Sequence, residues 1–115
     1  MKTSELTGAA LDWVVAKCEQ RADANIREGY AGSLLVVDDN DFGAPAAYST
    51  NWSQGGPIIE REGIAILQCP RGWAARIGFG GEYIEGPTPL IAAMRCYVSS
   101  KLGDDVELPA ELLGE

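Results

Sequence analysis

The segment from Gly86 to Gly103 places the strongest constraint on the fold. Thr88 is a favoured helix cap, and Pro89 follows at the first helical position, where its missing N–H costs little. Apolar residues then recur at helical spacing until Gly103, a residue typical of helix ends. The pattern predicts a helix over residues 88–102, with a buried stripe formed by Leu90, Ile91, Ala93, Met94, Tyr97, Val98 and Leu102.

A second helical pattern lies near the start of the chain. Apolar residues at spacings of three and four predict a helix over residues 6–20, with Trp13 as a core anchor. Thr3, Ser4 or Thr7 could cap its first turn.

Four short segments have the composition of β-strands. They are residues 34–37, 64–69, 73–79 and 82–85, and Pro70-Arg-Gly72 turns the second into the third as a hairpin. We therefore predict an α+β fold, in which a small antiparallel sheet of three to four strands packs against two helices. At 115 residues the chain forms one domain, over residues 1–115.

The segments between these elements are less well determined. Residues 19–32 leave two alternatives open, a short helix over 22–28 and a loop. Residues 43–57 have a loop-like composition, with two prolines and a Gly-Gly pair. Residues 58–59 could begin a helical turn or a short strand.

Composition excludes several functional classes. The net charge is −8 with nine scattered basic residues, which disfavours nucleic acid as a partner. The longest aliphatic run, residues 34–37, is too short to span a membrane. The chain has no histidine, so Ser-His and Cys-His catalysis are impossible and the usual zinc sites are disfavoured. We expect the three cysteines to be core residues in a reducing cytosol, and we expect no cofactor, no resident metal and no enzymatic activity.

Two acidic groups have residue types that could support chemistry. Asp38, Asp39 and Asp41 follow a predicted strand, but they lack the further ligands of a calcium loop. Glu60 and Glu62 would share a face if the segment were extended, yet the intervening Arg61 favours an ion-pair cluster over paired catalytic carboxylates.

The stretch of residues 48–62 is the strongest candidate for a site, because aromatic and polar side chains gather there around a Gly-Gly-Pro sequence. Trp52 and Tyr48 offer stacking surfaces, while Asn51 and Gln54 can each donate and accept hydrogen bonds. The predicted ligand-binding residues are Tyr48, Ser49, Thr50, Asn51, Trp52, Gln54, Gly55, Gly56, Arg61 and Thr88. The glycines would allow close approach of a ligand, Arg61 would pair with a phosphate, and the helix start at Thr88 would bind an anion.

Three blocks of sequence resemble a known family. Leu6-Thr-Gly-Ala-Ala-Leu-Asp-Trp-Val-Val-Ala-Lys-Cys-Glu19, Ser49-Thr-Asn-Trp-Ser-Gln-Gly-Gly-Pro-Ile-Ile-Glu-Arg-Glu62 and Gly86-Pro-Thr-Pro-Leu-Ile-Ala-Ala-Met-Arg95 are similar to NinX-type accessory proteins of tailed, lambdoid phages and prophages. This family often has Asp where the chain has Asn51, and usually Gly where it has Gln20. The resemblance implies a phage origin and the cytoplasm of the infected bacterium, and it implies little about chemistry.

Two hypotheses for function follow. The first is a non-catalytic phage protein that binds a small nucleotide-like ligand and sequesters a host immune signalling nucleotide, as a counter-defence. The alternative is a protein-interaction module that binds and inhibits a host protein, with Trp73 and Phe79 as aromatic anchors. The 46% apolar content is also compatible with a homo-oligomer.

Overall fold

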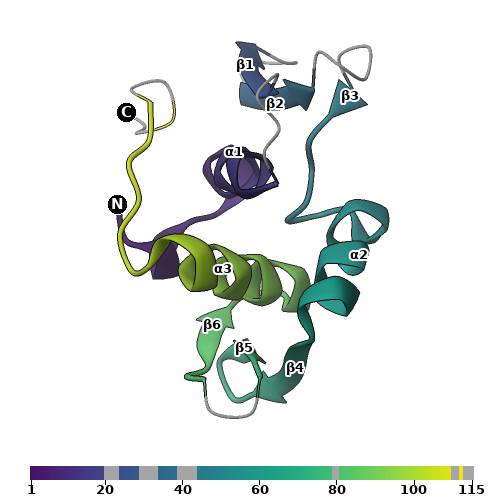
Figure 1. Ribbon diagram of the computed structural model, residues 1–115, viewed down its shortest axis with the longest axis vertical. Coiled ribbons are helices and arrows are strands. Elements are labelled where there is room, and N and C mark those ends of the chain that lie inside the picture. The colour runs from purple at the N-terminus through teal and green to yellow at the C-terminus, as the bar shows by residue number, and fades with distance from the viewer. Residues whose placement is uncertain (20–23, 29–33, 39–43, 79–80, 110–111, 113–115) are drawn as a thin grey trace.

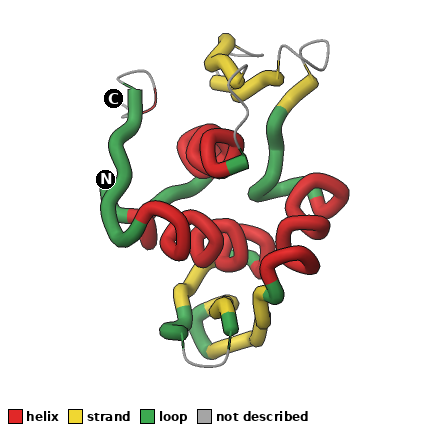
Figure 2. Tube along the Cα trace, in the orientation of Figure 1, coloured by secondary structure: helices red, strands yellow, loops and turns green. Residues whose placement is uncertain are grey.

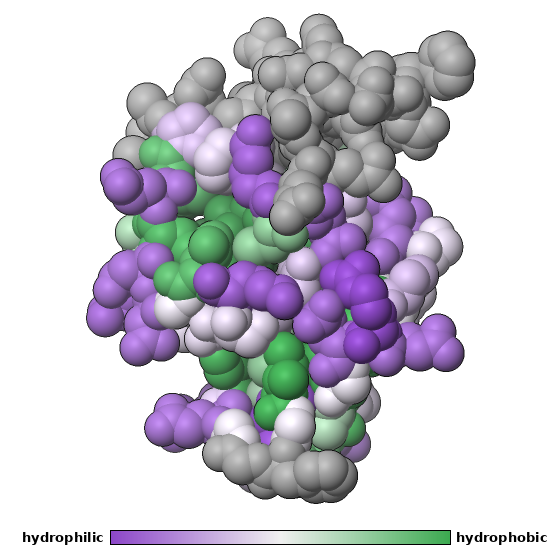
Figure 3. All heavy atoms as spheres, in the orientation of Figure 1, coloured by the Kyte–Doolittle hydropathy of each residue, from purple (hydrophilic) through white to green (hydrophobic). Residues whose placement is uncertain are grey.

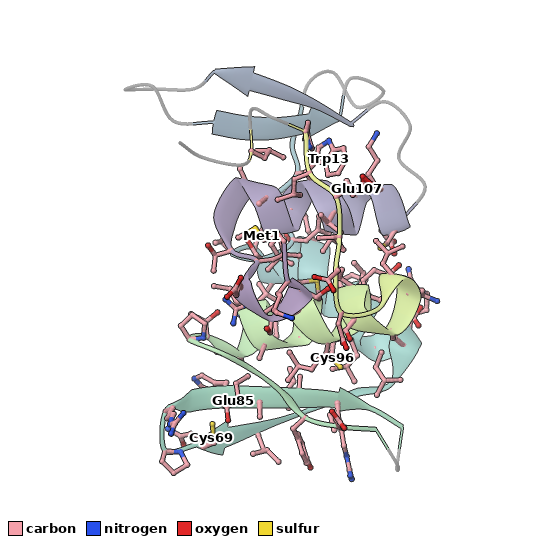
Figure 4. The ribbon with its side chains drawn as sticks, turned by 90° about the vertical axis from the view of Figure 1, so that its left-hand side faces the viewer. Met1, Trp13, Cys69, Glu85, Cys96 and Glu107 are labelled. Carbon is pink, nitrogen blue, oxygen red and sulfur yellow. The ribbon has the colours of Figure 1, made fainter. Side chains whose placement is uncertain are left out.

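The protein is layered, with helices between two sheets. The computed structural model describes residues 1–19, 24–28, 34–38, 44–78, 81–109 and 112. In the described part of the chain, the helices are α1 (Gly8–Cys18), α2 (Trp52–Glu62) and α3 (Pro89–Leu102), and a short 3-10 helix, η1 (Thr3–Glu5), precedes them. One sheet covers α1 and the other lies beneath α3 (Figures 1 and 2). A side view shows the four layers in succession (Figure 4).

The sheet over α1 is antiparallel, in the order β1-β2-β3. Its strands are β1 (Ala24–Glu28), β2 (Leu34–Asp38) and β3 (Ala44–Pro45). Ala24 lies opposite Asp38, and Val37 lies opposite Pro45. Both β1 and β2 contact α1.

The sheet beneath α3 is also antiparallel, in the order β4-β5-β6. Its strands are β4 (Ile64–Cys69), β5 (Gly72–Ile77) and β6 (Ile84–Gly86). A two-residue turn joins β4 to β5, so that Cys69 lies opposite Gly72 and Ile64 lies opposite Ile77. Ile64 and Ala75 point into the core from this sheet.

Helix α3 is the centre of the core. Seven consecutive residues, Ala92 to Val98, are buried, because α1, α2, β5 and β6 all contact this helix. Small residues make that possible: a Cβ atom at Gly86 of β6 would lie only 2.7 Å from the backbone nitrogen of Ala92. Fully buried Leu6, Leu11, Val14 and Val15 complete the core from the N-terminal side. A helix enclosed on nearly all sides needs apolar residues all round, and the buried stretch of α3 supplies them at every position except Arg95.

The two ends of the chain are joined by backbone hydrogen bonds. The Met1 ammonium group donates to the carbonyl of Val106 at 2.9 Å, and the Val106 N–H donates back to the Met1 carbonyl at 2.9 Å. The Thr3 hydroxyl donates to the carbonyl of Gly103 at 2.7 Å. The N-terminal segment is therefore held beside the end of α3.

A buried arginine ties the N-terminal segment to β6. The Arg95 guanidinium donates to the carbonyls of Leu6 and Glu85, at 2.7 and 2.8 Å. Burial lowers the pKa of Arg95 from its ordinary value. Both acceptors are backbone carbonyls, so these two hydrogen bonds crosslink the N-terminal segment and β6 through the main chain.

The predicted α+β class and its antiparallel strands are confirmed. The predicted helices correspond to α1 and to α3, and Thr88 caps α3 by accepting from the Ile91 N–H at 3.1 Å. The hairpin and its short third strand are present as β4, β5 and β6. Leu102 is an exception to the predicted stripe, because it is exposed.

Two expectations for local structure were wrong. For residues 22–28 the sequence allowed a short helix or a loop. Residues 24–28 instead form β1, because all five of them pair with β2. Residues 52–57 were expected in a loop but form the first half of α2. The described strands therefore number six in two sheets, where one sheet was expected.

Tertiary packing explains the unexpected helix α2. Its sequence is poor for a helix, with Gly55, Gly56 and an internal Pro57. Asn51 nevertheless caps it, and Gly55 lets it pack closely on α3. Packing of this kind commonly outweighs intrinsic propensity.

No helix in the described ranges has both the length and the apolar character that a bilayer span requires.

Candidate ligand pocket

The first turns of α2 and α3 meet at an open pocket. It has a volume of about 250 Å³ and is lined by Ser49, Thr50, Trp52, Thr88, Pro89, Leu90 and Ile91. We call it the α2–α3 pocket. It therefore brings together four predicted ligand-binding residues, namely Ser49, Thr50, Trp52 and Thr88, from segments almost forty positions apart in the chain.

Trp52 is the most accessible large side chain at this pocket. Its exposed fraction is 54%, although it is the first residue of a helix that buries Ile58 and Gly55. The fold therefore does not use the indole as a core residue. An exposed indole beside a pocket is a surface on which a flat ligand can stack.

A buried hydrogen bond fixes the chain just before Trp52. The Ser49 N–H donates to the carboxylate of Asp12 at 2.8 Å, and both residues are buried. Burial raises the pKa of Asp12, and the hydrogen bond from the Ser49 N–H partly opposes that rise. Asp12 lies on α1 and was not predicted as a site residue, since a single acidic residue in a helical stripe gives no sequence signal for this role.

Asn51 and Gln54 serve the local fold. The Asn51 side chain accepts hydrogen bonds from the Ser53 N–H at 2.9 Å and from the Ser53 hydroxyl at 2.6 Å, which caps α2. The Gln54 side-chain oxygen accepts from the Ala47 N–H at 2.7 Å. The side-chain oxygens of both residues thus accept bonds from the local chain, and neither residue lines the α2–α3 pocket.

Gly55 and Tyr48 pack inside the protein. A Cβ atom at Gly55 would lie 2.6 Å from both the Leu90 side chain and the Tyr48 carbonyl oxygen. The close approach predicted for a ligand is thus made by α3. The ring of Tyr48 packs against the core, whereas a Cβ atom at Gly56 would meet nothing within 4 Å.

Arg61 lies at the other end of α2. It lies nine positions after Trp52 in the helix, which corresponds to about 13 Å along the axis. Its guanidinium makes a two-pronged pair with the Glu19 carboxylate, at 3.1 and 2.6 Å, and a bond of 2.9 Å to Glu62. The structure therefore does not bring Arg61 to the α2–α3 pocket, and the ion-pair interpretation of this segment is the one found.

A tyrosine completes this ionic group. The Tyr97 hydroxyl donates to the Glu19 carboxylate, and Lys101 lies 3.7 Å from Glu62. Hydrogen bonds to Glu19 and Glu62 raise the pKa of Arg61, and burial together with the bond to Glu19 raises the pKa of Tyr97. We call Glu19, Arg61, Glu62, Tyr97 and Lys101 the Arg61 cluster.

Pro89, Leu90 and Ile91 line the pocket but were predicted only as helix residues. The signal that could have found them is their position in the first turn of a helix whose cap, Thr88, was itself a predicted site residue. Among the described residues, no three potential metal ligands lie together. Asp39 and Asp41 lie outside the described residues.

The molecule is thus a small α+β protein with an open pocket where two helices begin. It belongs to the NinX family of bacteriophage P22, whose family profile matches residues 2–101. No curated protein matches the chain at a significant level. The match covers all three sequence blocks that resembled this family.

Proposed function

We propose that this phage-family protein is a non-catalytic binder of a small, flat, nucleotide-like ligand, which stacks on Trp52 in the α2–α3 pocket. The observation that carries the proposal is the 54% exposed indole at the edge of that pocket. Because this indole stands beside a pocket rather than alone on the surface, it forms an apolar surface that a ligand can cover.

The polar groups of the pocket suit the rest of such a ligand. Thr50 and Thr88 are exposed and bring hydroxyl groups. The pocket also faces the starts of α2 and α3, where partial positive charge favours an anion. Arg61 has no part in this proposal, because it is held in the Arg61 cluster.

The size of the pocket limits what it encloses. Its volume of about 250 Å³ lies below the roughly 300–1,000 Å³ of sites that enclose drug-sized ligands. A single ring system fits that volume better than a whole dinucleotide. We therefore propose that a base or similar ring enters and that sugar and phosphate groups lie toward solvent.

The net charge of −8 gives the proposal a distinctive signature. Long-range repulsion opposes an anionic ligand, and added salt screens that repulsion. Affinity for a nucleotide should therefore increase with ionic strength, whereas affinity for the matching neutral nucleoside should not. This behaviour is opposite to that of a basic, phosphate-binding protein.

The biological role that we propose is sequestration of a host immune signalling nucleotide. Its support is the phage family of the chain, together with the absence of histidine from the sequence, which favours binding over catalysis. The role is inferred by analogy with phage accessory proteins, which often act against host defences.

The test is a thermal-shift screen with cyclic nucleotides, ADP-ribose-type nucleotides and their nucleosides. A ligand at 100 times its dissociation constant should stabilise the protein by about 2.7 kcal/mol. Trp52→Ala should remove the shift, whereas Tyr83→Ala, a change at another exposed aromatic side chain, should retain it. No shift with any compound would sink the proposal.

A second candidate function is binding of a host protein through a different surface. A hollow of about 380 Å³ lies between α1 and the C-terminal segment, and Trp13, Leu102, Val106 and Glu107 help to line it. Figure 3 shows hydrophobic side chains gathered in a hollow on this face, and Figure 4 shows Trp13 and Glu107 close together. Leu102 is 52% exposed there, which favours an apolar contact.

The anchors first suggested for such a partner fit less well. Trp73 packs against the core, and Phe79 lies outside the described residues. A pull-down from host lysate separates the two functions: a stoichiometric partner lost with Leu102→Glu and kept with Trp52→Ala supports the protein-binding alternative. Capture that both variants retain counts against it.

A further inference from the structure

Among the described strands, three of the four sheet edges carry features that prevent pairing with another strand. Strand β1 contains the charged residues Arg27 and Glu28, and β3 is two residues long and ends in Pro45. Strand β6 has three residues, and the Arg95 guanidinium occupies its Glu85 carbonyl at 2.8 Å. Short length, charge, proline and blocked carbonyls are the devices by which proteins protect sheet edges.

Strand β4 has none of these devices. It is the outer strand of its sheet, is six residues long, and its sequence Ile-Ala-Ile-Leu-Gln-Cys contains no charge and no proline. Among the described residues, β5 is the one strand that pairs with it, and no loop or turn residue bonds to its backbone. Ala65, Leu67 and Gln68 are exposed (Figure 1 shows β4 at the rim of the molecule).

The register of the hairpin shows which backbone groups are free to pair. Cys69 and Gly72 flank a two-residue turn, so they form a hydrogen-bonded pair. Bonded and non-bonded pairs alternate along an antiparallel ladder. The N–H and C=O groups of Ile64, Ile66 and Gln68 therefore point away from β5, toward the open edge.

We propose that β4 is the surface through which two copies of this chain associate, by antiparallel pairing across a two-fold axis at Ile66. This register places Ile66 opposite itself and Ile64 opposite Gln68 of the second copy. All three outward-pointing residues of each strand then exchange hydrogen bonds, and the two sheets join into one of six strands. The inference stands apart from the proposed ligand and goes beyond it.

Side chains on the outer face also complement each other in this register. The small Ala65 of one copy lies opposite the 39% exposed Leu67 of the other. Residues 64–70 contain no charge, so this contact brings no like charges together although each chain carries a net charge of −8. Self-complementarity of this kind selects a second copy over an unrelated strand.

The decisive comparison is Gln68→Pro against Gln68→Ala, measured by sedimentation velocity over a concentration series. Proline at position 68 removes an outward N–H and leaves the ladder to β5 intact, whereas alanine keeps that N–H. We expect a dimer for the wild type and for Gln68→Ala. Gln68→Pro should weaken dimerisation by about tenfold or more, since two intermolecular hydrogen bonds are lost.

The register has its own test. With Cys69→Ser as the background, Ala65→Cys combined with Leu67→Cys should give a covalent dimer on mild oxidation, because these positions face each other across the axis. Ala65→Cys alone should not, since position 65 does not face itself. A wild type that remains monomeric at every concentration, or a dimer insensitive to Gln68→Pro, would overturn the proposal.

Discussion

The two ends of helix α2 are stabilised by different interactions. At its start, Gly55 packs on Leu90 and the Ser49 N–H is bonded to buried Asp12, while the large side chain of Trp52 stays exposed. At its end, the exposed Arg61 side chain is held by carboxylates of the Arg61 cluster. One end has an available aromatic surface, and at the other the charged groups already bind each other.

This difference shows that residues close together in a sequence need not share a site. Residues 48–61 form one dense polar and aromatic stretch, yet a helix of 11 residues spans about 16 Å and separates its ends. The start of α2 meets Thr88, which is distant in sequence, and its end meets Glu19. Four substitutions can test whether the division of roles is correct.

The largest effect is expected at Gly55. Gly55→Ala would force a Cβ atom to within 2.6 Å of the Tyr48 carbonyl, so we expect a loss of about 2–3 kcal/mol in unfolding free energy. Gly56→Ala is the matched control, because its Cβ would meet nothing within 4 Å and helix propensity should give a gain of about 0.5–1 kcal/mol. Urea unfolding measures both. Equal effects would mean that α2 does not pack on α3 as described.

The next effect is expected at Asp12. Asp12→Ala leaves the buried Ser49 N–H without its acceptor, which should cost about 1–3 kcal/mol. Asp12→Asn retains an acceptor and removes a buried charge. Because the folded-state pKa of Asp12 is raised above its ordinary 3.8, the contribution of Asp12 to wild-type stability falls as pH rises from near 3.8 through the raised pKa.

The pH dependence therefore distinguishes Asp12→Asn from the wild type. Relative to wild type, Asp12→Asn should gain stability as pH rises over that window and hold the gain at neutral pH. Chemical denaturation from pH 3.5 to pH 7 measures the difference, with the pH limits chosen about the ordinary range of a carboxyl group. A constant difference across the series would contradict a raised pKa at this position.

A smaller effect is expected at Arg61. Its side chain is half-exposed, so loss of its ion pairs in Arg61→Ala should lower the unfolding free energy by about 1 kcal/mol or less. The loss should be smaller still in high salt. Ligand-induced thermal shifts should be unchanged, because Arg61 does not line the α2–α3 pocket. Loss of ligand binding in this variant, with stability retained, would restore Arg61 to the site.

The smallest effect on stability is expected at Trp52. Because the indole is more exposed than buried, Trp52→Ala should change the unfolding free energy by about 0.5 kcal/mol or less. The same variant should lose the proposed ligand. If Trp52→Ala instead unfolds the protein at lower urea than Gly55→Ala does, the indole is a structural residue and the contrast between the ends of α2 is wrong.

Much of the fold could be predicted because local signals and packing agree. The cap at Thr88, Pro89 and Gly103 define α3, and the turn after Cys69 defines the β4–β5 hairpin. Strand β1 could not be predicted, because its polar sequence becomes a strand only through pairing with β2. Helix α2 could not be predicted either, because glycine is a poor helix former. Gly55 stabilises α2 only through its close packing against Leu90, which is distant in the sequence.

The candidate site was predictable in its centre and not at its margins. Trp52 and Thr88 were identified from residue type and position, and they line one pocket. Arg61 has the right chemistry for a phosphate, but its nearest carboxylates come from Glu62 and from distant Glu19. The type of a residue indicates what its side chain can bind. The folded structure determines which groups lie close enough to bind it.

The pairing of Met1 with Val106 has a consequence for biosynthesis. Leu6 and the N-terminal segment find their acceptors and donors on Arg95, Gly103 and Val106, which a ribosome adds 89 to 105 residues later. The first residues to emerge must therefore wait, exposed, until residues 95–106 have also left the ribosome. A chain stalled before residue 95 should therefore be a ready substrate for chaperones and proteases.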